Sequence, residues 1–203
     1  MKVILISQDF YPQTGGIATY LLQVYRNYFN IEDFSVIVPK NISKEDDYKK
    51  FDFKVDRAKF SPFKSPTKRK KENKRILEIL ENEKPDLVLF GYLRSHPEVG
   101  EEYKKINPKC KCAIILHAKE AFLDSSITKN TNNNGKQKGY TKKEVVHYKR
   151  ILNGSDFLIT VSKFTKRLLK KQGIKNKFFI INPLLNEIPN LKFKSTLNKE
   201  FNL

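Results

Sequence analysis

The apolar residues of this chain fall into short, mostly continuous runs separated by longer polar or amphipathic stretches. The runs are Val3–Ile6, Phe34–Val38, Phe51–Val55, Leu87–Phe90, Ala113–Leu116, Phe157–Val161 and Phe178–Ile181. A strand covered on both faces needs no alternation of polar and apolar residues, so such runs are typical of a parallel sheet flanked by helices. The pattern therefore predicts a mainly parallel sheet of about seven strands.

The stretches between the runs carry the spacing and the end signals of helices. After the first run, one apolar face at helical spacing comprises Ile17, Leu21, Val24, Tyr25 and Tyr28. Later helices are predicted over Thr67–Glu83, ended by Pro85, over Thr141–Asn153, with a Thr141/Glu144 capping box, and over Lys163–Gln172, capped by Ser162 and ended by Gly173. This alternation predicts a Rossmann-like, doubly wound α/β domain with helices on both faces of the sheet and ligands beyond the carboxyl ends of its strands.

A Gly15-Gly16 pair lies between the first strand and the first helix. The N–H groups at a helix start have no partner within the helix and carry a partial positive charge, so a backbone without side chains there can receive phosphate or sugar oxygens. The alternative is a turn that merely needs positive φ. The preceding loop is unusually long and carries Asp9 and Tyr11, which favours a role at the site for both.

His117 follows the apolar run that ends at Leu116, so its ring is expected at the end of a strand. An imidazole there can exchange hydrogen bonds with a ligand hydroxyl, and Glu120 could hold its other nitrogen or contact the ligand. A capping or packing histidine is the alternative. Arg94 is a candidate for binding an anionic group of an acceptor, with a solvent-facing arginine as the alternative.

The net charge of +18 at pH 7 calls for a partner or a surface that explains it. In residues 59–75 two phenylalanines are interleaved with cations, and the candidates for contact with a membrane are Phe60, Phe63, Lys68, Arg69, Lys70 and Lys71. An anionic membrane surface would attract the cations and receive the rings. A nucleic acid partner and a plain solvated helix face are the alternatives.

Cys110 and Cys112 lie two positions apart at the start of an apparent strand. Both thiols would point to the same side, where they cannot pair well, so we expect reduced packing residues in a cytoplasmic protein. No further pair of metal-ligating residues follows at a suitable spacing, so no metal site is expected. The apolar run near Met1 is too short for a signal peptide or a membrane span.

Four segments together carry a family resemblance. Residues 10–20 (Phe-Tyr-Pro-Gln-Thr-Gly-Gly-Ile-Ala-Thr-Tyr), 85–90 (Pro-Asp-Leu-Val-Leu-Phe), 116–120 (Leu-His-Ala-Lys-Glu) and 155–166 (Ser-Asp-Phe-Leu-Ile-Thr-Val-Ser-Lys-Phe-Thr-Lys) resemble, in order and spacing, the N-terminal domain of group 1 (family 4) glycosyltransferases of GT-B architecture. Two positions depart from the family pattern. Ala118 follows the histidine where Gly or Asp is common, and residues 182–186 replace the usual Pro-Asn-Gly.

The resemblance implies that Gly15 and Gly16 approach the diphosphate and sugar of a nucleotide-sugar donor. It also implies that His117 is a catalytic residue that contacts the transferred sugar, and that Ser162, near the cleft, binds the phosphate or sugar of the donor. The anomeric configuration is expected to be retained. The nucleotide-sugar is a substrate, and neither cofactor nor metal is expected. The acceptor is expected to be a glycan or a lipid-linked molecule used in cell-surface polysaccharide or glycolipid synthesis, at the inner face of the plasma membrane.

Nothing after Ile181 is long enough to encode the second, donor-binding domain of such an enzyme. We therefore expect residues 1–183 to form the acceptor-side half of a GT-B architecture and residues 184–203 to be a linker or tail, with the donor domain supplied in cis or by a separate chain. The half alone is expected to be inactive. A non-catalytic sugar-phosphate or nucleotide-binding module remains the alternative, and a nucleic-acid-binding domain, for which no motif is recognisable, is less favoured.

Overall fold

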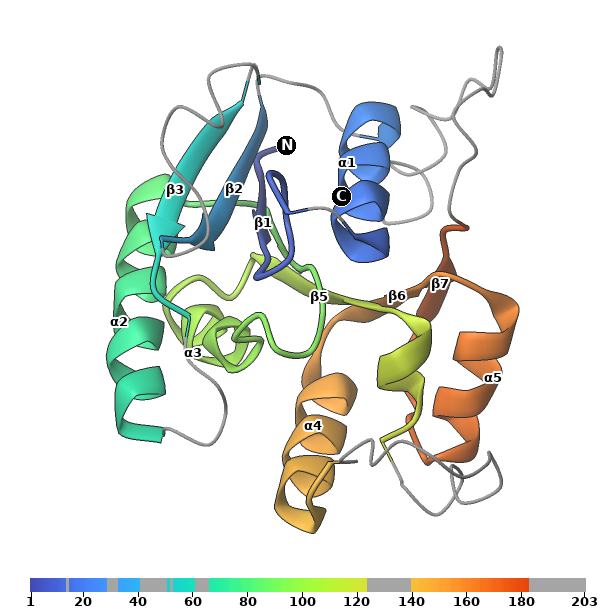
Figure 1. The fold of residues 1–203 in the computed structure, drawn as a ribbon. Coiled ribbons are helices and arrows are strands. Elements are labelled where there is room, and N and C mark those ends of the chain that lie inside the picture. Colours follow the sequence, from blue (N-terminus) through green and yellow to red (C-terminus); the bar gives the residue numbers. More distant parts are fainter. Residues whose placement is uncertain are drawn as a thin grey trace.

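Seven parallel strands form one sheet in the order β3-β2-β1-β4-β5-β6-β7 (Figure 1). The strands are β1 (Val3–Ile6), β2 (Phe34–Pro39), β3 (Lys54–Ala58), β4 (Leu87–Phe90), β5 (Lys111–Leu116), β6 (Phe157–Thr160) and β7 (Phe178–Ile180). This computed structural model describes residues 1–13, 15–28, 33–40, 51, 53–60, 66–123 and 140–182. The predicted doubly wound, parallel α/β architecture is confirmed.

The order of the strands reverses between β1 and β4, which lie side by side at the middle of the sheet. Every residue of β1 and β4 is buried, as the continuous apolar runs predict for strands covered on both faces. The connections that follow β1 and β4 therefore diverge to opposite sides. Ligands of doubly wound sheets bind at such a reversal, beyond the carboxyl ends of the strands.

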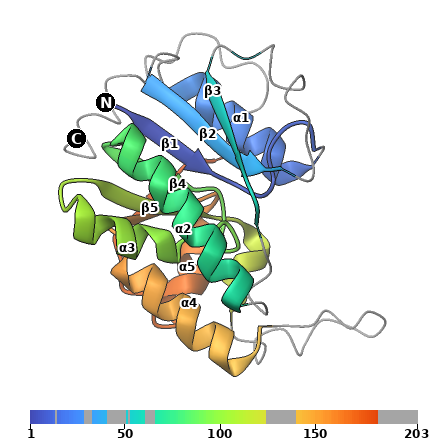
Figure 2. The same ribbon diagram turned by 90° about the vertical axis from the view of Figure 1, so that its left-hand side faces the viewer.

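Helices cover both faces of the sheet (Figure 2). They are α1 (Gly16–Tyr28), α2 (Pro66–Glu83), α3 (Glu98–Ile106), α4 (Lys142–Gly154) and α5 (Lys163–Lys171), with a short 3-10 turn, η3 (Ala118–Ala121). One core holds apolar residues of α2, α3, α4 and α5, whereas Leu21, Val24 and Tyr25 of α1 pack in the core on the other face. Within the described residues, α1 is thus the helix that covers the second face.

The predicted helix ends are confirmed at α4 and α5. Thr141 accepts a hydrogen bond from the N–H of Glu144, whose carboxylate accepts one from the N–H of Thr141, so the capping box is complete. Ser162 caps α5. Gly173 follows α5 with φ of 85°, a conformation that favours glycine.

Two parts of the predicted element pattern were wrong. The third strand begins at Lys54, not Phe51, because Phe51 and Phe53 place their rings in an aromatic cluster with Phe10. Helix α3 was missed. It is short, and Gly100 stands within it because an added Cβ would lie 3.0 Å from the ring of Phe90.

The two cysteines are free and buried in the same core cluster, as expected for packing residues. Among the described residues, no group of three or more His, Cys, Asp or Glu side chains is placed to hold a metal ion. None of the described helices is both long and apolar enough to cross a membrane.

Candidate functional site

The site predicted from the sequence lies along one edge of the sheet. Because all strands are parallel, the residues that follow β1, β4, β5 and β6 share the carboxyl edge. The start of α1, His117 and Ser162 each follow one of these strands. The fold thereby brings the three predicted motifs to a common edge.

The helix start at Gly15 and Gly16 is open. Neither glycine has φ in the left-handed region, and a Cβ added to either would meet nothing within 4 Å among the described atoms. The alternative of a turn that requires positive φ is therefore wrong. The carbonyl of Gly15 accepts from Thr19, so the N–H groups of Gly16, Ile17 and Ala18 have no acceptor within α1 and are suited to an anion.

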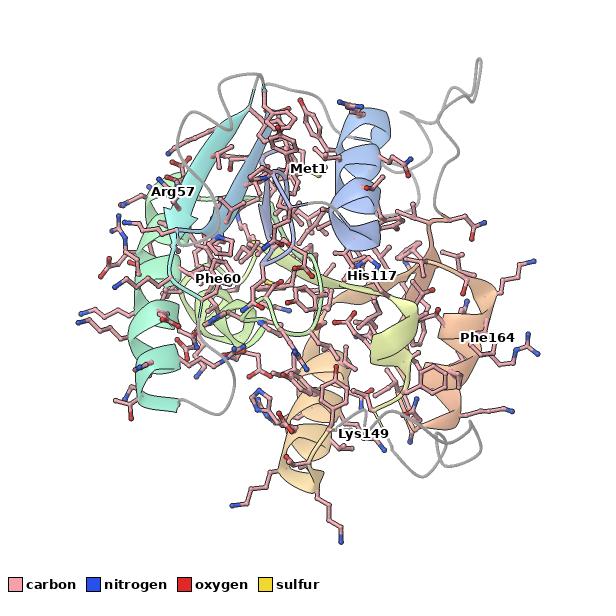
Figure 3. All side chains as sticks on the ribbon, in the orientation of Figure 1. Met1, Arg57, Phe60, His117, Lys149 and Phe164 are labelled. Atoms are coloured by element: carbon pink, nitrogen blue, oxygen red, sulfur yellow. The ribbon has the colours of Figure 1, made fainter. Side chains whose placement is uncertain are left out.

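The ring of His117 is half-buried just beyond the end of β5, near the first turns of α1 (Figure 3). Its Nε2 lies 3.0 Å from the carbonyl oxygen of Gly91. A carbonyl only accepts, so Nε2 carries the proton and Nδ1 presents a lone pair. Burial lowers the pKa of His117, which keeps the ring neutral near physiological pH.

Tyr20 connects α1 to this histidine. The edge of its ring meets the ring of His117 at a centroid distance of 5.3 Å and an interplanar angle of 88°. Its hydroxyl donates to the carbonyl of Ile181 at 2.9 Å. Tyr20 is anchored at both ends and limits the rotation of the imidazole. Apart from the position of Tyr20 on α1, no sequence signal points to this contact.

Gly91 is a second site residue that the sequence analysis missed. It follows β4 directly, donates its N–H to the carbonyl of Ile6 at 2.8 Å and accepts from His117. A Cβ on Gly91 would lie 2.5 Å from Oγ of Ser7, so only glycine fits between the ends of β1 and β4. A glycine directly after a buried strand was the available signal.

Glu120 does not hold the imidazole. Its carboxylate is buried and accepts from two backbone N–H groups, that of Leu93 at 2.6 Å and that of His117 at 3.0 Å. The prediction that Glu120 contacts the ring or the ligand was therefore wrong. Burial raises the pKa of Glu120 to about 8. The two N–H donors oppose this rise because they favour the ionised form.

The hydroxyl of Ser162 caps the N-terminus of α5. Its Oγ accepts from the N–H of Thr165 at 3.1 Å and lies 3.0 Å from the hydroxyl of Thr165. The residue lies at the predicted edge, but its contact with a donor stays a prediction.

The other predicted site residues lie in the loops that follow β1 and β4. Asp9 is half-buried, and burial raises its pKa while the nearby charge of Arg94 lowers it. Arg94 is exposed at the surface. Tyr11 turns its ring toward Phe51, at a centroid distance of 5.4 Å. Asp9 and Arg94 therefore lie near each other, while the ring of Tyr11 packs against the aromatic cluster.

The predicted membrane-facing group is only partly at the surface. Lys68, Lys70 and Lys71 are exposed on α2, but Arg69 is 5% exposed and forms an ion pair with Glu98. The prediction was wrong for Arg69 because α2 turns that position toward α3.

Phe60 is half-buried, with its ring edge against the buried imidazole of His96 at a centroid distance of 5.2 Å. Most of this ring therefore lies against the protein, which disfavours its entry into a membrane. Phe63, like residues 184–203, lies outside the described residues.

The fold and the open helix start define an α/β protein with a Rossmann-type site at a strand reversal. The model of Glycosyltransferase Family 4 matches residues 14–186. The chain therefore belongs to glycosyltransferase family 4. No match was found among the sequences of curated proteins.

Three solved structures show the same fold at low sequence identity. Anabaena Alr3699/HepE in complex with UDP and glucose shares 12% identity at a TM-score of 0.62, over 99% of this chain and 50% of that one. The lipopolysaccharide outer core galactosyltransferase WaaB, in its apo form, shares 14% identity at a TM-score of 0.60, over 94% and 48%. Sucrose-phosphate synthase from Thermosynechococcus elongatus shares 13% identity at a TM-score of 0.62, over 100% and 53%. The chain thus spans about half the length of these proteins.

Proposed function

We propose that this chain is the acceptor-side half of a glycosyltransferase that moves a sugar from a nucleotide-sugar donor to a glycan or lipid-linked acceptor. One observation carries the proposal beyond membership of the family. An open, glycine-lined helix start and a neutral imidazole with an unprotonated Nδ1 meet at the same edge of the sheet. Tyr20 joins the two through its ring contact with His117.

The chemistry assigns a separate task to each part. As the nucleotide diphosphate leaves, negative charge grows on the phosphate, which the N–H groups at the start of α1 complement. His117 would accept a hydrogen bond from a sugar hydroxyl at Nδ1 and so orient the ring for attack. We expect retention of the anomeric configuration. The proposal assigns no protein nucleophile, metal ion or cofactor.

The partner that completes the enzyme is a second α/β domain that binds the nucleotide. The chain spans about half of the similar solved structures, including that of HepE with UDP-glucose, at 50% of that chain. The second domain would follow in the same polypeptide or come from a separate chain. Its closure over the carboxyl edge would exclude water from the reaction.

The test is donor turnover. The chain, alone and combined with a donor-binding second domain, either continuous with it or supplied as a separate chain, is incubated with a panel of UDP-, GDP- and dTDP-sugars, and nucleotide release is measured. We expect release only from the combination, and a fall of about 10²-fold with His117→Ala. Turnover of no nucleotide-sugar by the combination would overturn the proposal.

A non-catalytic sugar-nucleotide-binding module is the second candidate. It would share the fold and the open helix start at Gly15 and Gly16. Saturable binding of a nucleotide-sugar by this chain, with no turnover in any combination, would decide for the module.

We also propose that the reaction takes place at the cytoplasmic face of the plasma membrane, with α2 toward the lipid. Its first turns expose Lys68, Lys70, Lys71 and Lys74, for which no acidic partner is found among the described residues. Each such lysine near an anionic surface adds favourable energy that salt weakens.

Vesicle flotation tests this orientation with a charge-matched control. Replacement of Lys68, Lys70, Lys71 and Lys74 by Gln should weaken binding to phosphatidylglycerol vesicles by at least about tenfold. Replacement of the four exposed cations of α5, Lys163, Arg167, Lys170 and Lys171, removes the same charge and should weaken it much less. Equal losses would show that charge acts without orientation, and equal binding to neutral vesicles would remove the electrostatic argument.

A further inference from the structure

The segments after β4 and β5 are joined by a closed set of hydrogen bonds around His117. The carbonyl of Gly91 accepts from the ring at Nε2, 3.0 Å away. The carboxylate of Glu120 accepts from the N–H of Leu93 at 2.6 Å with one oxygen and from the N–H of His117 at 3.0 Å with the other. The first bond holds the ring and the other two hold the backbone from which the ring projects.

Glu120 is too deeply buried to meet a substrate. It is 4% exposed. A buried carboxylate is costly unless it is fully hydrogen-bonded, and an apolar side chain of similar size would avoid that cost. A local cap of the turn that starts at His117 explains only the bond to the N–H of His117. The bond to Leu93 reaches a segment 27 residues away, the same one that supplies the Gly91 carbonyl.

We propose that Glu120 is a positioning residue that fixes the imidazole of His117 by tying its backbone to the segment after β4. The inference rests on the proposed function in that His117 meets the donor sugar. With the carboxylate in place, the distance between the His117 backbone and the Gly91 carbonyl is set from both sides, so the Nε2–H bond stays formed and Nδ1 keeps one direction.

Substitutions at Glu120 separate positioning from general stability. Glu120→Gln keeps one acceptor oxygen and turns an NH₂ group toward the other backbone N–H, while Glu120→Ala removes both acceptors. Gln172→Leu is the matched control. Nε2 of Gln172 donates to the carbonyl of Ala121, so this change removes a buried hydrogen bond from the same turn without touching His117.

The readout is nuclear magnetic resonance of the full 203-residue chain without any ligand. We measure the exchange of the His117 Nε2 proton with water and the cross-relaxation between the rings of Tyr20 and His117. Glu120→Gln loses one buried hydrogen bond, so we expect its His117 Nε2 proton to exchange about tenfold faster. The contact between the rings of Tyr20 and His117 should also weaken. Glu120→Ala should exceed this, and Gln172→Leu should match the wild type.

Unchanged exchange and ring contact in both Glu120 variants would overturn the proposal, as would equal changes in Gln172→Leu. If both Glu120 variants fail to fold, the carboxylate is a requirement of the fold and the positioning role is likewise overturned. Neither readout uses a sugar donor. A failure here therefore leaves the proposed transferase standing, and a failure of donor turnover leaves this result intact.

Discussion

Two histidines in this chain have contrasting surroundings, one enclosed between helices and the other at the carboxyl edge of the sheet. His96 lies between α2 and α3, fully buried, with Nδ1 against the amide oxygen of Asn73 and Nε2 3.9 Å from a carboxylate oxygen of Glu72. His117 lies at the carboxyl edge, half-buried, with Nε2 on a backbone carbonyl. Side chains lie near both ring nitrogens of His96. For Nδ1 of His117, in contrast, no protein partner is found among the described residues.

The difference teaches that the surroundings of the ring, and not the residue type, decide its use. Burial lowers the pKa of both rings, that of His96 to about 3. The cluster around His96 also contains the buried Arg69–Glu98 ion pair. A ring enclosed by side chains contributes to stability, and a ring held by backbone at an open edge remains available to a ligand.

The largest expected effects come from removing each ring in turn. His96→Ala removes a fully buried side chain and its bond to Asn73, and should cost about 2–4 kcal/mol of unfolding free energy, measured by urea denaturation. His117→Ala should cost less than about 1.5 kcal/mol because the ring is half-buried. Donor turnover should show the reverse ranking. A larger stability loss for His117→Ala than for His96→Ala would contradict the comparison.

The pH dependence of stability gives a medium effect. The pKa of His96 is about 3 in the folded protein against 6.5 ordinarily, so below pH 6.5 the unfolded state binds a proton that the native state does not. Unfolding free energy should therefore fall with pH from 6.5 toward 3, by up to about 1.4 kcal/mol per pH unit from this residue. The groups that face it are Arg69 and Glu72 of α2 and Glu98 of α3.

The comparison of wild type with His96→Asn isolates this contribution, because His117, His147 and the carboxyl groups titrate in both. The slope of unfolding free energy against pH should be smaller in the variant between pH 6.5 and the acid limit of folding. Parallel curves would show that His96 is protonated in the native state.

The smallest effect on stability is expected at the helix start. Gly16→Ala places a Cβ where nothing lies within 4 Å among the described atoms, and alanine favours the helix, so stability should stay the same or rise by up to about 1 kcal/mol. Donor affinity should fall, because the methyl group occupies the space offered to phosphate or sugar. Thermal denaturation and titration with the donor measure the two. Unchanged affinity would mean that no ligand approaches this backbone.

The sequence by itself determined the architecture, because its signals are local. Continuous apolar runs marked the strands, and the Thr141 and Ser162 caps fixed two helix starts within one residue. The Gly15-Gly16 pair also marked the start of α1, where one side of the candidate site is predicted. Each of these signals depends on residues within one turn or one strand, so the order and spacing of residues along the chain reveal it.

Only the tertiary structure decided which polar groups meet across the chain. The carboxylate of Glu120 binds an N–H 27 residues away, and the ring of His117 binds a carbonyl 26 residues away. Arg69 is buried in an ion pair with Glu98, 29 residues later in the chain, although the lysines on either side of Arg69 are exposed. Such partners come together when the sheet assembles and desolvation forces each buried polar group to find one. The spacing of residues along the chain does not reveal these partners, because the pairing depends on which strands and helices become neighbours.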